Sequence, residues 1–377
     1  SGDTIVDGST TDNDTLTAVI TAAPTKPTVS NVETVNINDK FNSGIDLSSV
    51  SHGVGGTVVM TSTSTAATVS SVSGANLMTV KAGSGLATLT VTDAQKNAVI
   101  DAGAATTISI DALNTAAAAD QSLTVKFNGT AAALNAPTHA FTALTLNSGT
   151  ADNTVTLGAP VAGTTGAITL TGDKSITLKS ATGNVTGITL TDSTTAGTTT
   201  LNITGTTSGD DLSKFGVDQF EVTGGSASTD SLTFATTGDV VKITKIGTGA
   251  AAQQLVISSA SATSTTDSIT LQLNNGSTAY RVDNGTNVFN TINMEALVDS
   301  SLDLRAGANA DVVLSGGKNI TLSTTSTAKS IVATAITGNL AASATANATK
   351  VTGGKGADTI TIESDALAAT VVGGDGS

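Results

Sequence analysis

Short segments in which aliphatic residues alternate with threonine or another polar residue recur along the chain. Representative segments are ITLT at 168–171, ITL at 188–190, SITLQL at 268–273 and ITL at 320–322. Alternation with a period of two and an excess of β-branched residues predicts strands with one buried face and one outer, threonine-bearing face. The segments are about four to six residues long and recur roughly every 8–15 residues, which suits a sandwich or a solenoid.

The composition narrows this choice, because the 377 residues include seven Phe, one Tyr and no Trp. The core must then consist of Val, Ile, Leu and Ala, and thin aliphatic cores fit coils that stack on one another. We therefore predict an all-β fold of parallel β-solenoid or β-roll-like modules with short strands, with tandem β-sandwich domains as the alternative. Helix signals are weak, and only the alanine-rich stretches 116–119 and 131–134 are expected to form short helical or loop excursions.

Internal repetition indicates two or three related β modules. GDKSITL at 172–178 resembles GGKNITL at 316–322, and NVETVNI at 31–37 returns with one insertion at 287–294. The sequence is expected to be a fragment of a longer protein, cut at both ends. The expected organisation is a degenerate calcium turn and linker at 1–29, a first β-rich module at 30–212, a second at 213–352, and the start of nonapeptide repeats at 353–377.

Charge and residue usage exclude several classes of protein. The net charge is −14 and arginine occurs only at positions 281 and 305, which disfavours nucleic-acid binding. There is no Cys for a disulfide, a thiolate nucleophile or a zinc site, and no apolar run of about 18 residues for a membrane span. His52 and His139 lack a neighbouring nucleophile–acid pattern. These features predict a protein that is not an enzyme.

The clearest motif lies near the C-terminus, where GGKGADTIT at 353–361 fits the calcium-binding nonapeptide G-G-x-G-x-D-x-U-x. Glycines let the turn backbone aim carbonyl groups inward, and the aspartate supplies carboxylate oxygen to a calcium ion. A second copy opens at GGDGS, 373–377. The predicted calcium-binding residues here are Gly354, Gly356, Asp358, Gly374 and Asp375.

Aspartate is also abundant in other turns, since 26 of the 30 acidic residues are Asp. The N-terminal tripeptides DTI at 3–5 and DTL at 14–16 echo DTI at 358–360. Weaker matches to the nonapeptide lie at 224–232 and 307–313. Aspartate favours turns as well as calcium, so ordinary turn chemistry is the alternative at each position. The further candidate calcium ligands are Asp3, Asp7, Asp12, Asp14, Asp230 and Asp311.

The nonapeptides, the VETVNI segment and the Thr-, Ala-, Gly- and Asp-rich, Cys-free composition resemble Gram-negative bacterial S-layer proteins exported by type I secretion. The compositional resemblance covers nearly the whole chain, whereas the specific motifs cover about 50 residues. It implies a secreted, calcium-dependent β protein that tiles the cell surface as a two-dimensional lattice of identical copies. It also implies an anchor, such as cell-surface lipopolysaccharide, contacted by a part of the protein outside this sequence.

Three functions are therefore compared. The first is a self-assembling surface-layer fragment with calcium as its cofactor. The second is a secreted adhesin or ligand-binding β-solenoid, because related repeats also occur in large adhesins. The third is a polysaccharide-active β-helix enzyme, which would need clustered Asp with Arg or Lys. No sequence rule places Arg281 and Arg305 together.

Overall fold

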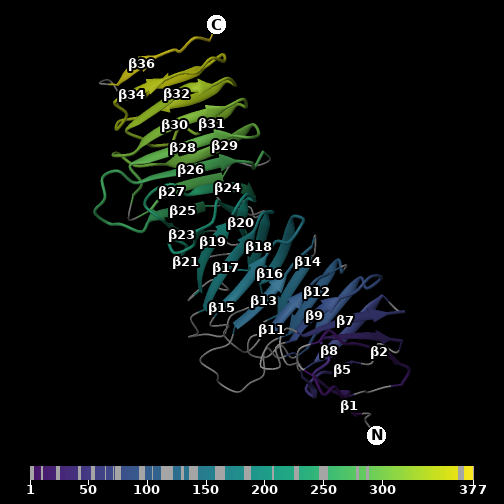
Figure 1. Ribbon diagram of the computed structural model, residues 1–377. Helices are drawn as coiled ribbons and strands as arrows, with labels where there is room; N and C mark the ends of the chain where they lie inside the picture. Colours follow the sequence, from purple (N-terminus) through teal and green to yellow (C-terminus); the bar gives the residue numbers. More distant parts are fainter. Residues whose placement is uncertain are drawn as a thin grey trace. The chain divides into compact units, whose positions relative to one another are not determined.

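The computed structural model shows a chain whose strands stack in parallel as a β-solenoid, which confirms the predicted fold class (Figure 1). From residue 56 onward, successive strands of each unit alternate between two sheets, so each coil adds one strand to each sheet. Every strand pairing among the described residues is parallel. This excludes the tandem sandwich alternative, whose sheets are antiparallel. The described residues contain no helix, and thus none able to span a membrane.

The described part of the chain is interrupted by short gaps. His52, His139, Asp3 and the stretch 116–119 lie outside it. The structure describes residues 4–9, 12–22, 26–40, 44–51, 56–63, 65–70, 72, 78–92, 98–103, 105–111, 122–128, 131–135, 143–157, 166–181, 188–205, 208–224, 229–245, 254–276, 280–285, 288–363 and 369–376.

The chain divides into two compact units, Ser1–Thr200 and Leu201–Ser377. In the first unit, a nine-stranded sheet runs in the order β19-β17-β15-β13-β11-β9-β7-β4-β2. Its strands are β2 (Thr15–Ile20), β4 (Thr34–Asp39), β7 (Gly56–Ser62), β9 (Met78–Ala82), β11 (Ala98–Asp101), β13 (Ser122–Lys126), β15 (Ala143–Asn147), β17 (Gly166–Gly172) and β19 (Ile188–Thr194).

The alternate strands of the first unit form its second sheet, and three short strands near the N-terminus form a small third sheet in the order β1-β3-β6. The second sheet contains β5 (Ile45–Asp46), β8 (Ala66–Ser70), β10 (Thr88–Val91), β12 (Thr107–Asp111), β14 (Ala131–Asn135), β16 (Asn153–Leu157) and β18 (Ile176–Ala181). The small sheet contains β1 (Thr4–Val6), β3 (Thr28–Ser30) and β6 (Val50–Ser51).

The second unit repeats this two-sheet plan, with β20 (Thr199–Gly205) spanning the unit boundary. One sheet contains β21 (Ser208–Asp211), β23 (Thr229–Phe234), β25 (Gln254–Ser259), β27 (Tyr280–Asn284), β29 (Ser300–Arg305), β31 (Ile320–Leu322), β33 (Leu340–Ala344) and β35 (Thr359–Ile362). The other continues from β20 through β22 (Gln219–Gly224), β24 (Val240–Lys245), β26 (Ser268–Leu273), β28 (Thr291–Ala296), β30 (Asp311–Gly316), β32 (Ser330–Ile336), β34 (Lys350–Thr352) and β36 (Thr370–Val372).

Aliphatic side chains at matching strand positions form continuous buried columns. In the second unit, Phe220, Val241, Leu271, Met294 and Leu314 are register partners on successive strands, and each is fully buried. The first unit has an equivalent column with no aromatic member. It runs through Val35, Val58, Val80, Ile100, Val125, Leu146 and Leu170.

The expected short helical or loop excursion at 131–134 is wrong, because these residues begin strand β14. Ala132 pairs with Ile108 of β12 on one side and with Val155 of β16 on the other. Alanine has the highest intrinsic helix propensity, but such propensities are small and tertiary context overrides them. Here two neighbouring strands satisfy the backbone of this segment, which fixes it as a central strand.

Some coil corners are closed by buried polar side chains. Asn284 is 7% exposed; its amide nitrogen donates to the carbonyl oxygens of Phe289 (2.9 Å) and Ala306 (3.0 Å). Its side-chain oxygen accepts the Phe289 N–H at 2.8 Å. The side chain thus replaces backbone partners that the chain loses where it leaves a sheet.

Candidate functional site

The first six residues of the nonapeptide, 353–358, form the corner between β34 and β35, and its last three begin β35. The Asp358 carboxylate accepts two backbone hydrogen bonds there. Its Oδ2 accepts the Gly354 N–H at 2.5 Å within the turn, and its Oδ1 accepts the Leu340 N–H of the preceding coil at 2.9 Å. Asp358 therefore holds its own turn and joins it to the neighbouring coil, whether or not it also binds a cation.

The motif's glycines lie where consecutive coils approach each other closely. A Cβ atom on Gly356 would lie 2.3 Å from the carbonyl oxygen of Gly338, and one on Gly374 would lie 2.3 Å from that of Gly354. Gly374 also has a φ of +83°, which side-chain-bearing residues rarely adopt. The backbone N–H of Asp375 donates to Gly354 at 3.0 Å, and its side chain is exposed.

A ladder of Asx side chains leads to this corner through the preceding coils. The Asn319 N–H donates to Asp299 Oδ1 at 2.9 Å, and the Asn339 N–H donates to Asn319 Oδ1 at 2.8 Å. The Ala357 N–H continues the series by donating to Asn339 Oδ1 at 2.9 Å. The ladder ends at Ala357, whose side chain has no oxygen to accept a further bond. The next residue, Asp358, instead accepts a hydrogen bond from the Leu340 N–H of the preceding coil.

Three of the N-terminal candidate calcium ligands form a compact acidic group. Asp7, Asp12 and Asp14 each offer a carboxylate oxygen, and these three oxygens lie within 4.8 Å of one another. The backbone N–H of Asp14 donates to Glu33 Oε2 at 2.9 Å, which adds a fourth carboxylate nearby. The charges of Asp12 and Asp7, followed by desolvation and Glu33, raise the pKa of the Asp14 carboxyl above its ordinary value. The folded chain therefore concentrates negative charge at this point.

The two weaker candidates lie elsewhere in the second unit. Asp230 is in β23, opposite Leu255. Asp311 begins β30, and its carboxylate accepts hydrogen bonds from Ser330 Oγ at 2.6 Å and Lys329 Nζ at 3.2 Å. The Ser330 hydrogen bond, opposed by desolvation and reinforced by Lys329, lowers the pKa of Asp311. A side-chain cation already compensates Asp311.

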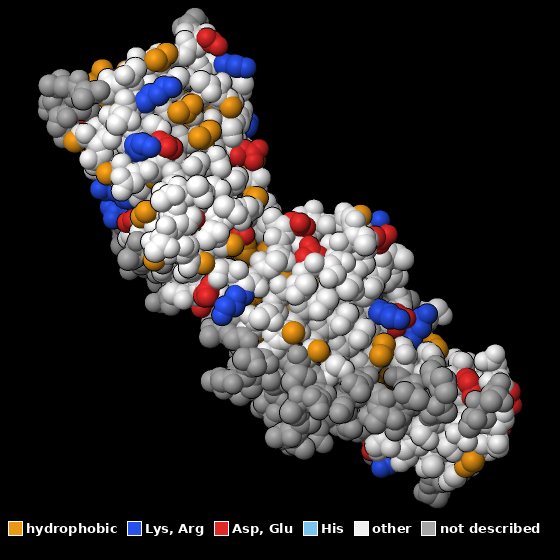
Figure 2. Space-filling view, turned by 60° about the vertical axis from the view of Figure 1, so that its left-hand side comes forward, with side chains coloured by type: hydrophobic (Ala, Val, Ile, Leu, Met, Phe, Trp, Pro, Cys, Tyr) orange, Lys and Arg blue, Asp and Glu red, His pale blue; other side chains and the backbone are white. Residues whose placement is uncertain are grey.

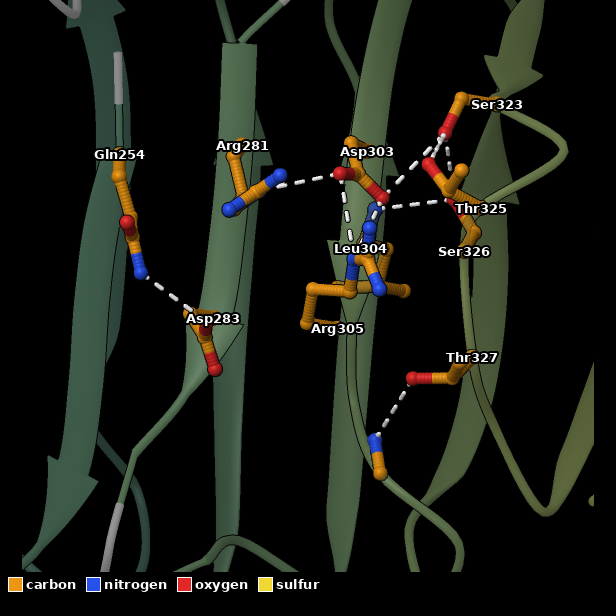
Figure 3. Close-up of polar contacts among 11 residues, drawn as sticks. Gln254, Arg281, Asp283, Asp303, Leu304, Arg305, Ser323, Thr325, Ser326 and Thr327 are labelled. Carbon is orange, nitrogen blue, oxygen red and sulfur yellow. Dashed lines mark hydrogen bonds and ion pairs between the residues drawn. The ribbon is translucent and has the colours of Figure 1, made fainter. Parts of the chain in front are cut away.

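Both arginines of the chain meet on one carboxylate, which the sequence analysis did not foresee (Figure 3). Arg281 Nε donates to Asp303 Oδ2 at 3.0 Å. Arg305 Nε donates to Asp303 Oδ1 at 3.0 Å and to Oδ2 at 3.2 Å. Burial alone would raise the pKa of Asp303, but hydrogen bonds from Thr325 and both arginines outweigh it and lower that pKa. Asp303 therefore stays ionised beside two cations.

The first unit carries an open groove of about 640 Å³ over the ends of β9, β11 and β13. Lys81, Asp101 and Lys126 line it at matching positions on these three strands. The Asp101 carboxylate accepts the Gly103 N–H at 2.8 Å. The sequence alone does not predict this row of three charged residues, because the strand register is needed to place them side by side.

Comparison of the chain with protein-family models, curated proteins and solved structures finds no match. The geometry and the sequence motifs are thus the basis for inferring function.

Proposed function

We propose that the protein is a structural component of a bacterial surface layer, secreted to the cell surface, whose copies associate into a two-dimensional lattice when calcium binds. The observation that carries this proposal is the place of the nonapeptide in the fold. It forms a corner between stacked coils of a parallel solenoid, with Gly356 against the preceding coil and Asp358 directed across the turn. Repeats of this type form glycine- and aspartate-rich turns of calcium-binding β-helices.

Calcium would be held by carboxylate and carbonyl oxygens, which are its preferred protein ligands. Asp7, Asp12 and Asp14 supply the densest such group among the described residues. The raised pKa of Asp14 supports this role, because the same repulsion that favours protonation also favours a divalent cation. At the other end, Asp358 would have to share its oxygens between calcium and the two N–H groups it already accepts.

The surface supports repeated contacts between identical copies. Figure 2 shows a face made mostly of backbone and of side chains that are neither charged nor hydrophobic, with only scattered acidic and basic groups among the described residues. The sequence contains 72 Thr and only 16 Lys and Arg together. Lysine on strand edges normally discourages association between sheets, so its scarcity favours such contacts. Heterologous contacts that do not close propagate into extended arrays, and many weak contacts add up through multivalency.

Thermal unfolding with chelator and with millimolar calcium tests the metal part of the proposal. Calcium that binds only the folded state should stabilise it by about 2.7 kcal/mol at a hundredfold excess over its dissociation constant. Magnesium should substitute poorly, because it requires a smaller, near-octahedral site. An unchanged midpoint in calcium would rule out the calcium role.

Negative-stain electron microscopy tests the lattice part separately. Ordered sheets that form on calcium addition and disperse in chelator are the expected result. A calcium-stabilised protein that forms no sheets and binds a host ligand as a monomer would instead favour the adhesin alternative.

A further inference from the structure

The outer face of the second unit carries a polar row that runs across consecutive strands (Figure 3). Gln254 of β25 is the register partner of Arg281 of β27, which in turn is the partner of Asp303 of β29. Ser323, directly after β31, extends the row by donating to Asp303 Oδ1 at 3.3 Å. The residues that follow the first three in sequence are Leu255, Val282 and Leu304, which are all buried, so the polar row faces outward.

The two arginines reach Asp303 through Nε alone. Within the described part of the chain, the terminal nitrogens of Arg281 and Arg305 donate no hydrogen bond. The two side chains are 34% and 35% exposed, so each is partly open to solvent. Asp303 thus holds two guanidinium groups in place while their forked ends stay available for another acceptor.

The choice of arginine supports a ligand rather than a general surface charge. Arginine occurs only at these two positions, and lysine supplies the other basic side chains. Lysine suffices for solvent-exposed charge, whereas a planar guanidinium matches an oxyanion through two parallel hydrogen bonds. The chain places its only two planar cations together on adjacent strands.

We propose that Arg281 and Arg305 form a binding site for the carboxylate or phosphate of an acidic oligosaccharide that lies across the strands. Adjacent strands are about 4.8 Å apart, a spacing comparable with the repeat of an extended hexose chain. Gln254 and Ser323 supply neutral hydrogen-bonding groups on either side of the arginines, where sugar hydroxyls would lie.

Asp283 sets the charge balance of the site. It lies opposite Arg305 in the strand register, and its Oδ2 accepts a hydrogen bond from Gln254 Nε2 at 3.0 Å. Its negative charge opposes an incoming anion. An Asp283→Asn variant can keep the hydrogen bond from Gln254 while removing that charge, and it should therefore bind the anion more tightly.

Titration calorimetry in chelator tests the site on the whole chain, independently of calcium and of assembly. The probes are tri-galacturonate for a sugar carboxylate, glucose 1-phosphate for a sugar phosphate, and maltotriose as the neutral control. Arg305→Gln should weaken binding of the acidic probe about tenfold or more, since hydrogen bonds to charged groups contribute about 1.5–3 kcal/mol. Asp283→Asn should tighten it several-fold.

Lys329→Gln is the matched control, because it removes a cation of the same unit that pairs with Asp311 at 3.2 Å. It should leave binding unchanged. Tighter binding of tri-galacturonate would identify a sugar carboxylate as the group that the arginines bind, and tighter binding of glucose 1-phosphate would identify a sugar phosphate. The proposal is overturned if neither acidic probe binds at millimolar concentration, if maltotriose binds equally well, or if Arg305→Gln binds like the wild type while Asp283→Asn gives no gain. Circular dichroism confirms that each variant keeps its β structure.

Discussion

The backbone N–H of Leu340 donates to Asp358 Oδ1 at 2.9 Å, so the aspartate of the nonapeptide is bonded to the coil before its own. Its other carboxylate oxygen accepts the Gly354 N–H. The same side chain therefore has a structural role that does not need a metal ion. A variant at Asp358 would lose both this structural role and the proposed calcium-binding role. Measuring its stability with and without calcium separates the two contributions.

Asp358→Ala should lower the free energy of unfolding in chelator by about 1–3 kcal/mol, because two backbone donors lose their acceptor. Most of the β structure should persist, since the change affects one corner of a long stack. Urea unfolding monitored by circular dichroism measures the difference. Asp375→Ala is the control, because that side chain is exposed. Equal stability of Asp358→Ala and wild type would show that the two hydrogen bonds contribute nothing.

Gly356→Ala should destabilise the protein by more than about 1 kcal/mol, the usual scale for a glycine replacement that strains the native backbone. The added Cβ would lie 2.3 Å from the Gly338 carbonyl oxygen, which belongs to the backbone and cannot rotate away. Gly373→Ala should be nearly neutral, because no atom lies within 4 Å of a Cβ there. Thermal unfolding of the two variants should thus differ clearly, and indistinguishable midpoints would contradict the close stacking of coils.

The sequence predicts the strands and their stacking because alternation of aliphatic residues with threonine is a local pattern. The corner at 353–358 was also recognisable, since glycine and aspartate occur there at fixed spacing. The arginine site was not, because coil length varies. Arg281 is in register with Asp303, 22 residues later, whereas Gln254 is in register with Arg281, 27 residues later. Without a constant period, register has to be seen in the structure.

Asp14→Asn should raise the unfolding midpoint in chelator at neutral pH. The pKa of Asp14 is raised in the folded state by Asp12 and Asp7, so the folded chain binds a proton more readily than the unfolded chain. The folded state therefore loses stability as pH rises from the ordinary pKa of 3.8 through the raised pKa of the folded state. At pH 7 the wild type carries the full destabilisation from this ionised carboxyl. The gain from Asp14→Asn should shrink on acidification and vanish below the ordinary value of 3.8, where both states are protonated.

The same variant should respond less to calcium, because it lacks one carboxylate of the acidic group. Asp173→Asn is the matched control, since it removes an exposed aspartate of the same unit away from that group. Melting curves across pH, recorded with chelator and with calcium, separate the stability gained by removing the charge from the stability lost by weakening the calcium site. A calcium-induced shift as large in Asp14→Asn as in wild type would place the calcium elsewhere.

Sedimentation velocity in chelator and in millimolar calcium tests the central claim, calcium-dependent self-association, most directly. In chelator the chain should sediment as a monomer of 36.7 kDa, because acidic surfaces with a net charge of −14 repel one another. Added calcium should neutralise or bridge these surfaces and shift the material to large, polydisperse species that dissolve again when the metal is removed. A chain that binds calcium and remains a monomer at millimolar metal would contradict the proposed surface-layer function.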